Sequence, residues 1–240
     1  DRDYYTKEDE KSKELRAGFV AHVTRMFQLL GEPESQAAAH AQAVMNIETE
    51  LAKGALDNVA RRNPQKTYHK MTVAKLTSLC PFLNWPKFFD GMAAPSIESL
   101  NVAEPTFFRT VESVVVQTSL DDLKTYLRWK YLNGEAALLP KAFVDEHLAF
   151  FGKTLTGAKE IQPRWKRCVE YTDGSLGEAL GQKYVEETFG AEGKKRTLEM
   201  VHAIEKAMDA DLKQLSWMTP ETRKQAHAKL EAVANKIGYP

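Results

Sequence analysis

Apolar residues recur every three or four positions along most of the chain, which is the spacing of an amphipathic α-helix. Two such stripes lie near the N-terminus: Leu15, Phe19, Val23, Met26 and Leu30, then Ala37, Ala41, Val44, Ile47 and Leu51. Gly31 and Pro33 separate them, because glycine commonly ends a helix and proline fits a first turn. The pattern predicts two consecutive helices.

Capping residues and prolines mark the starts of further helices. Thr72, Asn84, Ser119 and Thr219 can each accept a hydrogen bond from a first helical turn. Pro140 and Pro163 suit the first turns of two more. We expect these helices to bury Trp129 and Trp217 and four stripes: Leu120, Leu123, Leu127 and Tyr131; Trp165, Val169, Leu176, Leu180 and Tyr184; Leu198, Val201, Ile204, Met208, Leu212 and Leu215; and Ala226, Leu230, Val233 and Ile237.

Other segments predict connections. Residues 91–106 contain Gly91, Pro95 and Pro105 and are expected to be irregular, and residues 190–193 are expected to form a loop. Gly238 is expected to end the last helix. Residues 114–116 are three consecutive valines, a run that suits a strand, although a new helix begins shortly after it.

The predicted fold class is mainly α, a multi-helix domain of about eight to ten helices with little or no sheet. Hydrophobic residues make up 43% of the 240 positions and charged residues 28%, which is typical of a globular protein. No apolar run is long enough for a membrane-spanning helix. The chain begins without methionine, so we expect a piece of a longer protein.

Charge and cysteine content exclude some functions. The 33 Lys and Arg balance the 33 Asp and Glu, which argues against nucleic acid as a partner because such binders concentrate positive charge. Two cysteines, Cys80 and Cys168, form no disulfide framework and no Cys-x-x-Cys pair. We favour free thiols over a bridge between them.

The histidines give no metal site. Glu199 and His202 have the Glu-x-x-His spacing of di-iron bundles, but the second copy that such a site needs is missing. Glu205 and Asp209 share a helical face, as in some zinc enzymes, but no His-Glu-x-x-His motif completes them. We therefore favour a surface Glu199, a partly buried His202 and a solvated face at 205 and 209.

Three further groups have ordinary structural interpretations. Gly174, Gly177 and Gly181 lie within a helical pattern, so close packing of a neighbouring helix is favoured over a phosphate cradle. Arg164, Trp165, Lys166 and Arg167 mix cations with an indole, and we favour a buried Trp165 over an anion site. Cys168 has no neighbouring base in the sequence, so an inert thiol is favoured over a nucleophile.

A set of ordered motifs closely resembles the neprilysin-like zinc metallopeptidases, specifically their N-terminal helical region. The matching segments are residues 139–143, 150–157, 162–168, 179–181, 184–185, 215–218, 221–223 and 236–240, with residues 1–5, 62–64, 68–71 and 84–85 upstream. They span essentially the whole chain. The resemblance implies that residues 1–240 are part of a helical cap domain, which faces a catalytic domain across a cavity that admits peptides.

The catalytic motifs of that family are absent from this sequence. The resemblance therefore implies no catalytic residue and no metal ligand here; substrate-binding residues stay unassigned, and zinc is expected on a catalytic domain outside this chain. The partners implied are that domain and peptide substrates. In animal members the counterpart of Cys168 is usually disulfide-bonded, and whether Cys80 replaces its partner stays open. Few cysteines suggest a bacterial-type member, exported or cytoplasmic.

Two alternative hypotheses stand beside the one that this chain is a non-catalytic part of a metalloendopeptidase. One is a stand-alone helical module that has lost its catalytic half and binds another protein through an exposed apolar face. The other is an autonomous helical hydrolase or di-metal enzyme, which the single Glu-x-x-His disfavours. A reading frame that continues past Pro240 into His-Glu-x-x-His would favour the peptidase.

Overall fold

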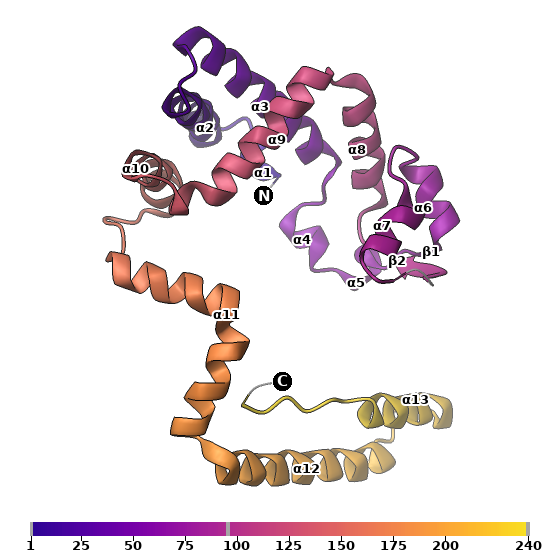
Figure 1. Cartoon of the computed structure of the whole chain (residues 1–240). Helices are drawn as coiled ribbons and strands as arrows, with labels where there is room; N and C mark the ends of the chain where they lie inside the picture. Colours follow the sequence, from indigo (N-terminus) through magenta and orange to yellow (C-terminus); the bar gives the residue numbers. More distant parts are fainter. Residues whose placement is uncertain (1, 95–96, 239–240) are drawn as a thin grey trace. The chain divides into compact units, whose positions relative to one another are not determined.

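The computed structural model describes residues 2–94 and 97–238 and divides into two compact units, residues 1–161 and 162–240 (Figure 1). Unit 1 contains α1 (Asp3–Thr6), α2 (Glu10–Leu29), α3 (Glu34–Gly54), α4 (Asn58–Arg61), α5 (Pro64–Thr67), β1 (Lys70–Thr72), α6 (Val73–Leu79), α7 (Trp85–Gly91), β2 (Ser99–Asn101), α8 (Pro105–Gln117), α9 (Leu120–Glu135), the 3-10 turn η1 (Ala136–Leu138), α10 (Lys141–His147) and the π-helix η2 (Leu148–Leu155). Unit 2 contains α11 (Arg164–Thr188), α12 (Gly190–Gln214) and α13 (Pro220–Glu231).

The predicted mainly α class is confirmed. The described residues hold thirteen α-helices, three of which are single turns, and one small sheet. In that sheet β1 and β2 run antiparallel, with Met71 opposite Leu100. None of the described helices is long and apolar enough to cross a membrane.

The main core of unit 1 lies where α2, α3 and α9 pack together. Trp129 of α9 is 2% exposed and lies among Val23, Met26 and Phe27 of α2 and Val44 of α3. The two N-terminal stripes are therefore buried much as predicted, except that Leu30 is 46% exposed. A smaller cluster beneath the sheet contains Leu76, Cys80, Trp85, Phe89 and Val102.

The predicted helix starts are confirmed at atomic detail. Thr72 accepts a hydrogen bond from the backbone N–H of Lys75, and Asn84 accepts one from Lys87. Ser119 and Thr219 accept the equivalent bonds from Asp122 and Thr222. These caps satisfy backbone donors that have no partner within the helix.

Several boundaries predicted from the sequence are wrong. Residues 190–193 are not a loop, because α12 begins at Gly190 directly after Phe189. The last helix ends at Glu231 rather than Gly238, and Val233 is exposed. Residues 91–106 are only partly irregular, since β2 pairs with a strand about thirty residues earlier. The valines at 114–116 lie in α8, and Asp1, Pro95, Tyr239 and Pro240 lie outside the described residues.

The buried stripe predicted for α9 is also wrong. Leu120, Leu127 and Tyr131 are exposed, and α9 instead buries Thr125, Trp129 and Leu132 against the core. Both faces of this helix carry apolar residues, so periodicity alone could not tell which of them meets α2 and α3.

Unit 2 buries little within itself. Among its described residues Val185 and Leu212 are the buried apolar side chains. Trp165, Leu176, Leu180 and Tyr184 of α11 are exposed, as are Ile204 and Met208 of α12 and Trp217 after it. These side chains were expected in a core, and the core that would cover them is not formed by unit 2.

Candidate functional site

The predicted Glu-x-x-His pair lies on the exposed side of α12. Glu199 and His202 are both exposed, which corrects the expectation of a partly buried histidine. No cluster of three His, Cys, Asp or Glu suited to a metal ion exists among the described residues. Nothing in the structure brings further ligands to this pair.

Glu205 and Asp209 hold unit 2 together. Asn235 donates a hydrogen bond to Glu205 Oε1 at 2.9 Å. Asp209 accepts from Lys213 Nζ at 2.6 Å and pairs with His227 Nδ1 at 2.7 Å, which joins α12 to α13. The hydrogen bond from Lys213 holds the pKa of Asp209 below its ordinary value, with His227 adding to the effect. The shared helical face is therefore a packing surface between elements.

The three glycines lie inside α11 as predicted, but no neighbouring helix of unit 2 packs on them. A Cβ added at Gly174 or Gly181 would meet nothing within 4 Å. At Gly177 it would meet only the side chain of Asp173, one turn earlier in the same helix. Close approach of a helix to these glycines is therefore not formed within unit 2.

The Arg-Trp-Lys-Arg segment opens α11 in an exposed position. Trp165 is 65% exposed, against the expectation that it is buried, and the Lys166 ammonium lies 5.5 Å from its ring centroid. Cys168 is exposed and Cys80 is buried, and neither forms a disulfide. Burial raises the pKa of the Cys80 thiol, which keeps it protonated and unreactive.

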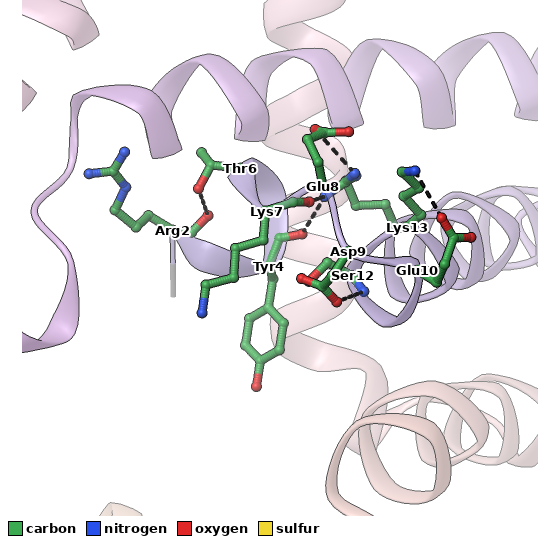
Figure 2. Close-up of polar contacts among 10 residues, drawn as sticks. Arg2, Tyr4, Thr6, Lys7, Glu8, Asp9, Glu10, Ser12 and Lys13 are labelled. Atoms are coloured by element: carbon green, nitrogen blue, oxygen red, sulfur yellow. Dashed lines mark hydrogen bonds and ion pairs between the residues drawn. The ribbon is translucent and has the colours of Figure 1, made fainter.

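The N-terminal motif is fixed against α2 by one arginine. Arg16 donates to the backbone carbonyl of Lys7 at 2.5 Å and to that of Tyr4 at 3.3 Å, and pairs with Glu8 at 3.5 Å. Asp9 caps α2 by accepting from the backbone N–H and hydroxyl of Ser12 (Figure 2). The packed segment leaves an apolar pocket of about 70 Å³, lined by Tyr4, Tyr5, Leu15, Arg16, Phe19, Met45, Phe150, Phe151 and Leu155.

A larger cleft of about 530 Å³ lies between α3 and α8. Its walls carry Glu50 and Lys53 from α3, Arg109 and Thr110 from α8, and Asp122 at the start of α9. Lys53 pairs with Glu50 at 2.6 Å. Charges of both signs and several hydroxyls line this cleft, and we assign it no ligand.

A buried histidine lies between α2, α9, α10 and η2. His22 is 0% exposed, and its Nδ1 is 2.9 Å from Oε1 of Glu146. Arg25 Nε approaches the same oxygen at 2.8 Å. Burial lowers the pKa of His22, and the hydrogen bond to Glu146 offsets only part of that effect.

Sequence reasoning missed this charged cluster. His22 follows Phe19 by three positions and precedes Met26 by four, so its place on the buried face of α2 was readable from the same stripe. Glu146 lies 124 residues away in the chain, and no sequence signal links the two.

The matched family model covers residues 1–240 and is described as Peptidase family M13, N-terminal region. Mouse endothelin-converting enzyme 1 is 32% identical over 244 residues, which cover all of this chain and 32% of the relative. The chain thus spans about a third of the length of the curated relatives it matches.

Solved structures show the same relationship. The open state of the zinc metalloprotease Zmp1 from Mycobacterium tuberculosis has a TM-score of 0.81 and 33% identity, covering all of this chain and 37% of that one. PepO from Lactobacillus rhamnosis has a TM-score of 0.80 at 19% identity, over all of this chain and 38% of that one, which supports the fold alone. The resemblance to neprilysin-like metallopeptidases is confirmed, and the chain belongs to Peptidase family M13, whose N-terminal family model matches it from end to end.

Proposed function

We propose that this chain is a non-catalytic helical part of a zinc-dependent metalloendopeptidase, in which it forms part of the wall of a peptide-binding cavity. The family match over residues 1–240 supports this assignment. The catalytic domain of the same polypeptide is its partner, and peptides are the substrates of the whole enzyme.

The observation that carries the proposal is the exposed apolar surface of unit 2. Leu176, Leu180 and Tyr184 follow one another at helical spacing on α11, and Met200, Ile204 and Met208 do so on α12. Exposing one such side chain is ordinary, but rows of them at helical spacing are typical of a surface that another protein element covers. We assign that cover to the rest of the polypeptide.

The residues that the structure describes do not fit a zinc site. Among residues 2–94 and 97–238, no third ligand lies beside Glu199 and His202, and Glu205 and Asp209 are engaged by Asn235, Lys213 and His227. We therefore assign no catalytic step to these side chains. In the whole enzyme, zinc held by the catalytic domain would lower the pKa of a bound water for attack on a peptide carbonyl.

An assay of the purified chain tests the proposal. We expect no stoichiometric zinc by elemental analysis and no cleavage of an internally quenched peptide, with or without a chelator. The protein expressed from the complete reading frame should cleave the same peptide and lose that activity to the chelator. Chelator-sensitive cleavage by the isolated chain would contradict the proposal, and so would a reading frame that ends at Pro240, which favours the stand-alone binding module.

A charge placed on the exposed apolar row tests the assigned interface. In the complete protein, Ile204→Asp should lower peptidase activity at least tenfold while leaving the helix content of the isolated chain unchanged, because Ile204 is 60% exposed in unit 2. Gln182→Asp, an exposed polar position of α11, is the matched control and should retain activity. Equal activity of both variants would show that Ile204 does not face a partner surface.

A further inference from the structure

His22 lies in a cage of aromatic rings contributed by two other elements. The ring of Phe150 stacks on His22 with centroids 5.2 Å apart and 12° between the planes. Trp129 of α9 and Phe151 of η2 meet the imidazole edge-on at 5.6 and 5.4 Å. Gly18 of α2 lies close to the same ring, since a Cβ there would lie 3.4 Å from Phe150.

One of the two ring nitrogens of His22 has a hydrogen-bond partner and the other has none. With Glu146 ionised, Nδ1 carries the proton and donates it to the carboxylate. Nε2 is buried and has no hydrogen-bond partner. The neutral ring tolerates this, since Nε2 is then an unpaired acceptor; a second proton would create a buried N–H with no acceptor, beside rings that offer only their π-electrons.

The charges around the cluster are already balanced before His22 is protonated. Arg25, from α2 itself, neutralises Glu146 of α10 through the shared Oε1. His147 of α10 lies 6.3 Å from His22 and stacks on Phe151 at 4.7 Å. The side chains that α9 and η2 place against His22 are uncharged aromatic rings, those of Trp129, Phe150 and Phe151. A proton on His22 therefore adds a positive charge next to Arg25 and a titratable His147.

We propose that His22, Glu146 and the rings around them form an acid-sensitive latch, which holds α10 and η2 on α2 when His22 is neutral and releases them when His22 takes up a second ring proton. The apolar pocket of about 70 Å³ borders the same rings, Phe150 and Phe151, and gives η2 room to shift. The latch rests on contacts within unit 1 and does not depend on the proposed function.

The direction of the pH effect follows from the pKa values. Burial lowers the pKa of His22 below its ordinary value of 6.5 in the closed state, and burial also lowers that of His147. In an open state both histidines return toward ordinary values, so the open state binds more protons below pH 6.5. Opening should therefore become up to about tenfold more favourable per pH unit for each proton taken up. Burial raises the pKa of Glu146, but the hydrogen bonds from Arg25 and His22 outweigh the effect of burial and hold that pKa below its ordinary value of 4.5. Protonation of Glu146 therefore contributes to opening only below pH 4.5.

Histidine NMR and hydrogen exchange test the latch in the full chain. In a sample with ¹³C- and ¹⁵N-labelled histidine, the His22 resonance, assigned through His22→Gln, should stay that of the neutral Nδ1–H tautomer below pH 6.5. Exchange of the α10 and η2 amides, corrected for intrinsic rates, should show an opening constant that rises as the pH falls from 6.5. His22→Gln should reduce that slope by one proton, and the exposed His202→Gln is the matched control that keeps it.

Glu146→Gln provides a second variant should His22→Gln fail to fold. It keeps an acceptor for Nδ1 but removes the negative charge, so His22 should titrate at a still lower pH. Titration of His22 at or above pH 6.5 would overturn the latch, because Glu146 and the stacked ring would then favour the charged imidazole. A pH-independent opening of α10, or an unchanged slope in His22→Gln, would overturn it as well.

Discussion

At the scale of single residues, Gly54 is a position where a neighbouring helix leaves no space for a side chain. It ends α3, and a Cβ there would collide with the Oγ1 of Thr110 in α8 and lie 2.5 Å from its Cβ. The close approach sets the distance between two helices that border the cleft.

Gly54→Ala should therefore destabilise the chain by about 1–3 kcal/mol, the usual cost of overpacking. Equilibrium denaturation followed by tryptophan fluorescence measures it. Gly134→Ala is the matched control, because Gly134 lies in α9 with nothing within 4 Å of an added Cβ. That change should stabilise by about 0.5–1 kcal/mol through helix propensity. A neutral Gly54→Ala would mean that α3 and α8 are not closely packed.

Residue-level predictions succeeded where the cause is local. The caps at Thr72, Asn84, Ser119 and Thr219 depend on a few neighbouring residues, and all four form as expected. The prediction that Trp165 and Trp217 are buried was wrong, because burial depends on which surface covers a side chain in the folded protein. The His22–Glu146 pair was missed for the same reason, since its partners meet only in the tertiary fold.

At the scale of elements, α11 is a long helix that contains residues of low helix propensity near its middle. It is continuous from Arg164 to Thr188, yet a cavity lined only by residues 173–179 opens beside it, and Figure 1 shows it bent midway. Sharp bends in helices are commonly found at Gly and Ser, and this stretch contains Gly174, Ser175 and Gly177.

Gly174→Ala and Gly181→Ala should each stabilise α11 in the isolated chain, by roughly 0.5–1 kcal/mol, because alanine loses less backbone entropy and meets no neighbour. Hydrogen exchange of the α11 amides measures the gain. Gly190→Ala is the contrasting control, since its φ of +66° is strained for alanine, and it should destabilise unit 2. A loss of protection in Gly174→Ala would restore the close-packing explanation.

The helices and their order along the chain could be predicted from hydrophobic periodicity, but the small sheet and several helix boundaries could not. The strands β1 and β2 are three residues each and pair across a long separation, so neither carries an alternating pattern long enough to detect. The end of α13 at Glu231 was missed because Ala226 and Leu230 continue a helical stripe into residues that are not helical.

At the scale of the whole molecule, the two units differ in how many apolar side chains each of them buries by itself. Unit 1 has two clusters of buried side chains, whereas Val185 and Leu212 are the buried apolar residues described in unit 2. Amides protected by few buried contacts exchange through small local openings. The sequence predicted helices for unit 2 correctly and a core for it wrongly, because its apolar faces lack a cover within unit 2 itself.

The central claim is that those faces are covered by the remainder of a metallopeptidase. Hydrogen exchange compared between the isolated chain and the protein from the complete reading frame tests it most directly. We predict that residues 165–184 and 198–208 become at least tenfold better protected in the complete protein, while the α2 and α3 core, buried in both, is unchanged. Equal protection of α11 and α12 in the two proteins would contradict the claim.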